Sequence, residues 1–343
     1  MSGRLAVVAI GGNSLIKRGD LRTVEDQYRA LCETVEHIAE VAAQGWRVVV
    51  THGNGPQVGF IMLRSEIARE VAGMHMVPLV SCVADTQGAI GWQIQMAMDN
   101  ALAARGLPGR TVTVVTQSLV DVADPAFAEP DKPIGEFYTK GQLGELGRHH
   151  PEWVLKEDAG RGWRRVVASP KPVDILELDA VRTLLDAGFN VVAGGGGGIP
   201  VVRVPAPDSG WDRPMSHDAK ASRTPNTQEG SSLILEGVDA VVDKDLASAL
   251  LASKLGAELL VISTAVDHVA LNYGTPLETP LGRVDLTTMK ALLADGHFAP
   301  GSMAPKIAAA VDFLEFGGKE VIITRPENLY RALSEGSGTH IVR

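Results

Sequence analysis

The stretch Phe189-Asn190-Val191-Val192-Ala193-Gly194-Gly195-Gly196-Gly197-Gly198-Ile199-Pro200 carries the strongest structural signal in this chain. An apolar run ends in five consecutive glycines, as expected for a buried strand that leads into a bare backbone loop. Glycine loses more backbone entropy on folding than any other residue, so five in a row make a poor spacer. They leave backbone N–H groups unobstructed, and such groups can surround an anion. We therefore predict an anion-binding loop at 194–198, after a strand over 189–193.

Two further glycine loops follow strand-like runs earlier in the chain. Residues 5–10 lead into Gly11-Gly12-Asn13, and residues 46–50 lead into Thr51-His52-Gly53-Asn54-Gly55-Pro56. Any one of the three loops is about as well explained as an ordinary strand–helix turn. Three of them at strand ends together favour one pocket built along one edge of a sheet.

The remainder of the chain alternates β-branched strands with amphipathic helices. Further strands are predicted at 112–115, 239–242, 258–262 and 320–323. Helices are predicted between Thr23, a candidate N-cap, and Gly45, a candidate C-terminal cap, and at 57–70, 86–105, 179–187, 246–255 and 304–316. This alternation predicts an α/β fold with a mostly parallel central sheet sandwiched by helices.

Two segments interrupt the alternation. Residues 118–170 are rich in proline, glycine and charge, and a stretch of that length in a compact domain predicts a small protruding subdomain, which we expect to act as a lid. Residues 206–231 are polar, lack apolar periodicity and include Pro207, Pro214 and Pro225, which predicts a flexible insert.

Composition restricts the class of protein. The 343 residues are 45% hydrophobic, enough for a sizeable core, and Lys+Arg 32 against Asp+Glu 41 gives a net charge of −9. That charge argues against nucleic-acid binding, which needs a basic surface. Cys32 and Cys82 are the only cysteines, so no disulfide framework is indicated. No signal segment or membrane span is apparent, and we expect a cytoplasmic protein without membrane partners.

Three lysines lie where phosphoryl-transfer chemistry would need positive charge. Lys244 ends the strand predicted at 239–242, Lys306 lies between a glycine loop and a helix, and Lys132 lies in the protruding segment. Fixed ammonium groups and backbone amides stabilise the negative charge of a phosphoryl group in transfer. A solvated surface residue is the usual interpretation of any single lysine, and Lys244 departs from it most, because flanking carboxylates at a strand end can orient it.

Other phosphate and metal motifs fit less well. No G-x-x-x-x-G-K-[ST] motif is present, and Ile199 stands where a dinucleotide fingerprint needs Gly or Ala. His149-His150 has no partner at metal-ligand spacing, so we predict no metal site made by the protein. His52 is assigned a structural or binding role, because transfer to an anionic acceptor needs no general base.

Several motifs resemble those of carbamate kinases, in the amino-acid kinase superfamily, in order along essentially the whole chain. They are Ile10-Gly11-Gly12-Asn13, residues 52–59, Lys132-Pro133-Ile134-Gly135, residues 157–164, Ser169-Pro170-Lys171-Pro172, residues 194–202, Val242-Asp243-Lys244-Asp245 and residues 297–306. Glu136, where the family usually has Pro, and Ala265, where it usually has Gly, depart from the pattern.

The resemblance implies a homodimeric enzyme that transfers a phosphoryl group between ATP and carbamate with Mg²⁺, usually from carbamoyl phosphate to ADP. It implies an acceptor lobe at 1–205 and a nucleotide-binding lobe at 232–343. It assigns acceptor binding to Gly11, Gly12, Asn13, Gly53, Asn54, Gly194, Gly195 and Gly196. It assigns nucleotide binding to Lys244, Thr264, Val266, Asp267, Tyr273, Phe298, Gly301, Ser302, Met303 and Lys306. The catalytic set would be Lys132, Lys244, Lys306 and Asp245, with Asp245 orienting the lysines.

Two alternatives stay open. One is a related kinase that phosphorylates another small carboxylate. The other is a catalytically silent sensor that binds nucleotide or carbamoyl phosphate.

Overall fold

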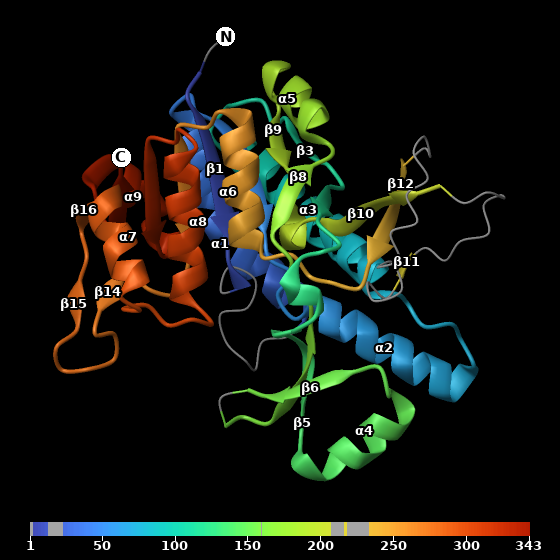
Figure 1. Cartoon of the computed structure of the whole chain (residues 1–343). Coiled ribbons are helices and arrows are strands. Elements are labelled where there is room, and N and C mark those ends of the chain that lie inside the picture. The colour runs from blue at the N-terminus through green and yellow to red at the C-terminus, as the bar shows by residue number, and fades with distance from the viewer. Residues whose placement is uncertain (1–2, 13–22, 159, 207–215, 218–232) are drawn as a thin grey trace.

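The central sheet of the protein is predominantly parallel. A computed structural model describes residues 3–12, 23–158, 160–206, 216–217 and 233–343. Within these residues, strands pair in the order β16-β18-β17-β13-β1-β2-β9-β3 (Figure 1). Their bounds are β1 (Leu5–Ile10), β2 (Arg47–His52), β3 (Thr111–Thr113), β9 (Asn190–Val192), β13 (Leu259–Ser263), β16 (Arg283–Asp285), β17 (Glu320–Thr324) and β18 (Thr339–Val342). From β17 to β3 every neighbouring pair is parallel, whereas β18 runs antiparallel to β17. The predicted fold class is confirmed.

Helices cover both faces of this sheet because its strands are apolar on both sides. In β1, Val8 packs with one buried cluster and its neighbour Val7 with the other. The Val8 face is covered by α1 (Val24–Ala43), α3 (Leu79–Ala104) and α9 (Leu329–Glu335). The Val7 face is covered by α5 (Leu178–Asp186), α6 (Lys244–Leu255), α7 (Leu286–Ala294) and α8 (Met303–Glu315).

Local sequence signals explain where several helices begin and end. Thr23 and Asp26 form a reciprocal capping box at the start of α1, and Gly45 follows its end with a φ of 85°. These predictions are confirmed. The helix predicted at 86–105 begins earlier, at Leu79, directly after Pro78.

The strand predicted at 239–242 is wrong. The strand in this region is β12 (Leu233–Val238), and beyond it Ala240 makes an isolated bridge to Ala168. Asp243 then caps α6, so Lys244 occupies the first turn of a helix rather than the end of a strand. The apolar residues at 240–242 are buried in the connection between β12 and α6. A short apolar run looks the same in sequence whether it is a buried connection or a buried strand.

A second, mixed sheet contains strands from before and after the pentaglycine loop. Its order is β11-β12-β10-β4-β8, with β4 (Gln117–Val120), β8 (Pro172–Ile175), β10 (Ile199–Pro205) and β11 (Ser216–His217). β11 is the part of the predicted insert at 206–231 that forms a described strand, and it pairs with β12. The insert otherwise lies almost entirely outside the described residues.

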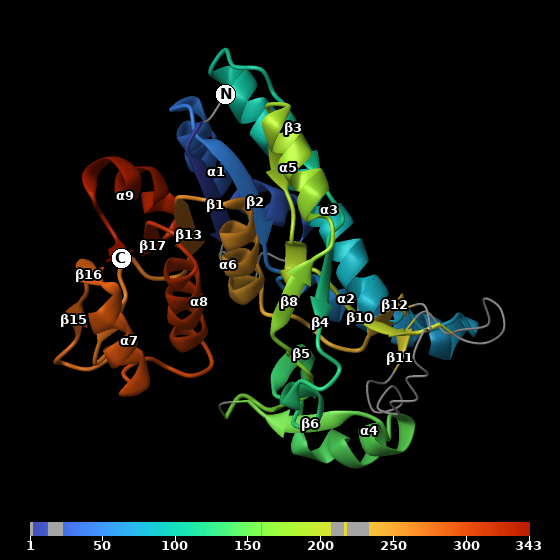
Figure 2. The same ribbon diagram turned by 45° about the horizontal axis from the view of Figure 1, so that its top comes forward.

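The protruding subdomain stands apart from the main body (Figure 2). It comprises an antiparallel sheet of β5 (Lys132–Tyr138), β7 (Trp163–Val167) and β6 (Val154–Glu157), together with α4 (Leu143–His149). Helix α2 (Gln57–Ala72) contacts β5 so closely that a methyl group on Gly59 would lie 2.9 Å from Cα of Gly135. A small hairpin of β14 (Ala270–Leu271) and β15 (Thr279–Pro280) lies beside β16 and α7 (Figure 1).

The pentaglycine loop makes a short turn in which both backbone conformation and space demand glycine. Gly194, Gly196, Gly197 and Gly198 have φ values of 64°, 65°, 90° and 84°. A Cβ on Gly196 would lie 2.0 Å from Oδ1 of Asn54, and one on Gly198 would lie 2.2 Å from Oγ of Ser118. The loop is therefore built against its neighbours rather than free, and the N–H groups of Gly194, Gly197 and Gly198 already donate within the protein.

We expect Gly196→Ala to lower the free energy of unfolding by about 2 kcal/mol or more, through the left-handed φ and the contact with Asn54. Gly144→Ala, in α4, is the matched control because its added methyl would meet nothing within 4 Å. Urea denaturation of both variants measures the difference. Equal stability of the two would contradict the packing of this loop.

Among the described residues, no helix is both long enough and apolar enough to cross a membrane.

Candidate active site

The three glycine loops meet at one edge of the central sheet. β1, β2 and β9 are parallel neighbours, so the loops that follow them emerge side by side. The N–H of Gly53 donates to the carbonyl of Ile10 at 3.2 Å, and the N–H of Ala193 donates to the carbonyl of Val50 at 3.0 Å. A Cβ on Gly53 would touch the side chain of Lys244 at 3.3 Å. The loops and the first turn of α6 therefore surround one region.

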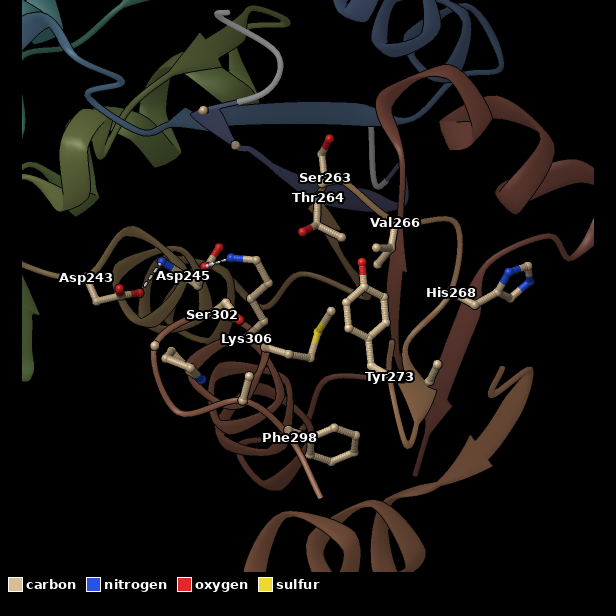
Figure 3. A pocket seen from close by; sticks show the side chains of 18 of the residues that line it. Asp243, Asp245, Ser263, Thr264, Val266, His268, Tyr273, Phe298, Ser302 and Lys306 are labelled. Atoms are coloured by element: carbon tan, nitrogen blue, oxygen red, sulfur yellow. Dashed lines mark hydrogen bonds and ion pairs between the residues drawn. The ribbon is translucent and has the colours of Figure 1, made fainter. Parts of the chain in front are cut away.

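Lys244 and Lys306 share the carboxylate of Asp245. Nζ of Lys244 lies 2.5 Å from Oδ1. Nζ of Lys306 lies 2.8 Å from Oδ2, and Figure 3 shows Lys306 reaching Asp245. Asp245 is 3% exposed. Burial alone would raise its pKa, but the two ammonium groups outweigh that effect and hold the pKa at about 2. The carboxylate is therefore ionised at any working pH and fixes both lysines.

Lys132 reaches the same place from the protruding subdomain. Its Nζ donates to Oδ2 of Asp243 at 3.2 Å and to the carbonyl of Val242 at 3.3 Å. The other oxygen of Asp243 caps α6, accepting from the backbone N–H groups of Asp245 at 2.9 Å and Leu246 at 3.4 Å. All three predicted lysines thus gather around the first turn of one helix.

Two cavities open onto these lysines. The first, of about 450 Å³, is bounded by elements of the second half of the chain and by Gly11 and Gly12. Its predicted nucleotide-binding lining residues are Lys244, Thr264, Val266, Tyr273, Phe298, Gly301, Ser302, Met303 and Lys306. Tyr273 and Val266 lie across it from Asp245 (Figure 3). It combines an apolar wall with a polar end where Lys244 and Lys306 lie with Asp243 and Asp245, which suits a ligand with one apolar and one charged part.

Asp267 is the exception among the predicted nucleotide residues. It does not belong to the lining of the first cavity. Its Oδ1 accepts from Nδ2 of Asn328 at 2.6 Å and lies 3.6 Å from Nε of Arg325. In this structure Asp267 ties the loop after β13 to the segment after β17.

The second cavity, of about 550 Å³, lies between the body and the protruding subdomain. It shares Asp243, Lys244, Asp245 and Lys306 with the first cavity. Its other polar and glycine lining residues are Gly53, Asn54, Gly55, Gly59, Lys132, Gly135, Glu136, Arg161, Arg164 and Gly196. With five cationic side chains against three carboxylates, it is suited to a small anion.

The residues predicted to bind the acceptor do not all line one cavity. Gly53, Asn54 and Gly196 line the second cavity, whereas Gly11 and Gly12 line the first. Gly194 and Gly195 are buried and line neither cavity; a Cβ on Gly195 would lie 2.3 Å from Nε2 of His52. Asn13 lies outside the described residues.

Arg161 and Arg164 are candidate site residues that sequence reasoning missed. Both are held by Asp158, at 2.9 and 3.2 Å, and Arg164 also donates to the carbonyl of Gly135 at 3.1 Å. Each guanidinium lies 5.0 Å from the ring centroid of Phe137. The motif at 157–164 had signalled this segment, but nothing in it showed that its arginines face the second cavity.

His52 is a buried, neutral histidine. Its Nδ1 lies 2.9 Å from the carbonyl oxygen of Gly53, so that nitrogen carries the proton. Burial lowers the pKa of His52 to about 4; the contact with Gly53 opposes this shift and the charge of Lys244 adds to it. Of the two roles predicted from sequence, structural or binding, this environment favours the structural one.

We expect His52 to make stability depend on pH. Its folded pKa is below the unfolded value of 6.5, so its contribution is complete above pH 6.5 and is lost as the pH falls towards 4. The shift corresponds to about 3 kcal/mol over that window. Urea unfolding at pH 7 and pH 4.5 should show a smaller loss of stability for His52→Asn than for the unchanged protein. An identical loss would mean that His52 does not titrate as described.

No group of three or more His, Cys, Asp or Glu side chains that could hold a metal ion occurs in the part of the chain that the structure describes. At the junction of the cavities, both oxygens of Asp245 and both of Asp243 already have partners.

Fold and site together define a phosphotransferase, because two cavities on either side of a fixed lysine pair can hold a phosphoryl donor and an acceptor. The chain matches the model of the amino acid kinase family over residues 4–205 and 220–325. It belongs to that family.

Named relatives cover nearly the whole chain. The chain is 48% identical to the carbamate kinase-like protein YahI of Escherichia coli (strain K12), over 99% of each chain. It is 40% identical to the carbamate kinase of Pyrococcus horikoshii, over 98% of each. Among solved structures, the carbamate kinase of Giardia lamblia bound to AMP-PNP superposes with a TM-score of 0.84 at 38% identity, over 99% of both chains.

Proposed function

We propose that this protein is a carbamate kinase, which transfers a phosphoryl group between carbamoyl phosphate and ADP, giving ATP and carbamate. Carbamate then breaks down to ammonia and CO₂. The observation that carries the proposal is the sharing of Lys244, Asp245 and Lys306 by two cavities of different character. The carbamate kinases of Pyrococcus horikoshii and Giardia lamblia, similar over nearly the full length, support it.

The first cavity is the proposed nucleotide site. Its apolar wall, with Val266, Tyr273 and Phe298, would take the base, and Lys244 and Lys306 at its other end would take the phosphates. Gly11 and Gly12 line this cavity beside the end of β13, where a Cβ on Gly11 would lie 2.9 Å from the carbonyl oxygen of Ser263. We therefore place these two glycines near the phosphate groups rather than around the acceptor.

The second cavity is the proposed acceptor site. Gly53, Asn54 and Gly196 would surround carbamate or carbamoyl phosphate with Lys132. Oδ1 of Asn54 is buried without a hydrogen-bond partner in the described structure. A buried acceptor of this kind is costly unless a ligand supplies a donor, and the amino group of a carbamoyl moiety is such a donor.

Transfer in this arrangement needs no proton exchange with the protein. A terminal oxygen of the ADP β-phosphate attacks the phosphorus, the bond from phosphorus to the carbamoyl oxygen breaks, and the electron pair leaves with carbamate. Negative charge on the transferred group is opposed by Lys244, Lys306 and Lys132. The neutral His52 takes no part, in keeping with its burial.

Mg²⁺ would enter with the nucleotide. The nearby carboxylates of Asp243 and Asp245 are engaged by lysines and by the cap of α6, so the residues present fit an ion carried mainly by phosphate oxygens and water. When bound, the ion would neutralise part of the phosphate charge.

A coupled assay for ATP formation from ADP and carbamoyl phosphate tests the function. We expect turnover with carbamoyl phosphate that exceeds turnover with acetyl phosphate at equal concentration. Preference for acetyl phosphate would favour the related carboxylate kinase. Calorimetric binding of ADP or carbamoyl phosphate without any turnover would favour the sensor.

We also propose that the enzyme acts as a homodimer in the cytoplasm. Free Cys32 and Cys82 suit a reducing compartment. Exposed apolar side chains at Ile67 and Val71 on α2, followed by Met74, suit a covered surface. Light scattering should give twice the mass of the chain; a monomer at working concentration would contradict the dimer.

A further inference from the structure

Two carboxylates form ion pairs with three ammonium groups where the cavities meet. Asp245 holds Lys244 and Lys306. Lys132, which comes from a different part of the fold, is held instead by Asp243. The side chains of Lys132 and Asp243 are each 25% exposed, so their ion pair is only partly screened by water.

Asp243 cannot rotate freely to follow Lys132. Its Oδ1 accepts backbone N–H groups at the start of α6, which fixes the carboxylate relative to the helix. Its Oδ2 is thereby presented at a defined point beside Lys244 and Asp245. An ammonium group bound at that oxygen has a defined position relative to the other two.

Apolar packing beside the Lys132–Asp243 ion pair joins the same two segments of the chain. Lys132 begins β5, and two residues later Ile134 is buried in a cluster with Val58, Met62 and Val241. Val241 belongs to the connection that ends at Asp243. The polar contact and this apolar cluster together join the base of the protruding subdomain to the start of α6.

We propose that Asp243 is a positioning residue for Lys132: its carboxylate fixes the lid lysine at the place where the phosphoryl group is transferred. The inference rests on the proposed function. Asp243 acts through Lys132 and itself caps α6. Three ammonium groups against two carboxylates also leave one net positive charge for the phosphoryl group.

Asp243→Asn separates this role from helix capping, because asparagine caps helices as well as aspartate does. We expect kcat/KM for carbamoyl phosphate to fall about tenfold, as for loss of one charged hydrogen bond. The KM for ADP should change less than kcat/KM for carbamoyl phosphate, because Lys132 lines only the second cavity, although Asp243 lines both. The matched control is Asp285→Asn, which caps α7 through a 2.9 Å contact with the N–H of Thr288 and should leave the kinetics unchanged.

A double-mutant cycle with Lys132→Ala identifies the pathway of the effect. If Asp243 acts through Lys132, then Asp243→Asn has no further effect in a Lys132→Ala background. Additive losses would overturn the proposal, since they would place the action of Asp243 on Lys244 or on the substrate. Kinetics of Asp243→Asn equal to those of Asp285→Asn would overturn it as well.

Limited proteolysis tests the same contact without relying on turnover. In the free protein, Asp243→Asn should increase the rate of cleavage within residues 132–167 relative to Asp285→Asn. Equal rates would contradict the contact even if the enzyme is active. An inactive wild type whose cleavage still responds to Asp243→Asn would instead refute the proposed function and keep the contact.

Discussion

Lys306→Ala is expected to lower kcat about 100-fold or more, because an ammonium group aimed at the transferred phosphoryl contributes roughly 3 kcal/mol to the transition state. Lys306 comes from the first turn of α8 and lies in the lining of both cavities. Its side chain is 18% exposed and contacts Asp245. Lys244→Ala should have a similar effect, since Lys244 contacts the other oxygen of the same carboxylate.

Thermal stability separates this effect from misfolding. Asp245 would keep one lysine partner in either variant, so we expect the melting temperature to change little. Lys319→Ala is the control: this lysine is 71% exposed, pairs with Glu258 at 2.7 Å and lines neither cavity. Steady-state assays at saturating ADP and carbamoyl phosphate provide the comparison. Near wild-type turnover of either lysine variant would remove that lysine from the catalytic set.

Asp245→Asn is expected to reduce both activity and stability. The substitution leaves two ammonium groups close together without their shared counter-ion, and such uncompensated charge in a buried site costs about 3 kcal/mol or more. Both lysines would also lose the carboxylate that orients them, so we expect kcat to fall about 100-fold or more. Urea denaturation and initial-rate measurements on the same preparation give the two quantities.

The two lysine variants and the carboxylate variant should therefore differ in a specific way. Lys306→Ala should impair turnover with an almost unchanged free energy of unfolding, whereas Asp245→Asn should impair both. If Asp245→Asn proved as stable as the wild type, Lys244 and Lys306 would not depend on it for charge compensation, and the electrostatic description of the site would be wrong.

Much of the fold follows from sequence because its strands are apolar on both faces. Near-continuous runs such as residues 5–10 suit a sheet covered by helices on both sides, and this sheet is so covered. The glycine run at 194–198 was a reliable signal of a tightly packed loop, because left-handed φ values and close contacts exclude most other residues there. The error at 239–242 shows the limit of apolar runs, which report burial more directly than strand pairing.

The candidate site was less accessible to sequence reasoning, because its contacts join distant parts of the chain. Lys132 and Asp243 are 111 positions apart, and no local pattern predicts that they meet. The capping role of Asp243 could have been found, since aspartate before a helix is a strong N-cap signal. No local signal could have predicted the position of Asp267, because its placement beside Asn328 and Arg325 depends on how two loops pack.

The position of β13 in the central sheet has a consequence for how the enzyme unfolds. β13 comes from the second half of the chain, yet it pairs on one side with β1 and on the other with β17. The pairing of β1 with β13 therefore joins the two halves of the chain in one hydrogen-bonded sheet. We expect a single calorimetric transition for both halves, with ADP raising its midpoint.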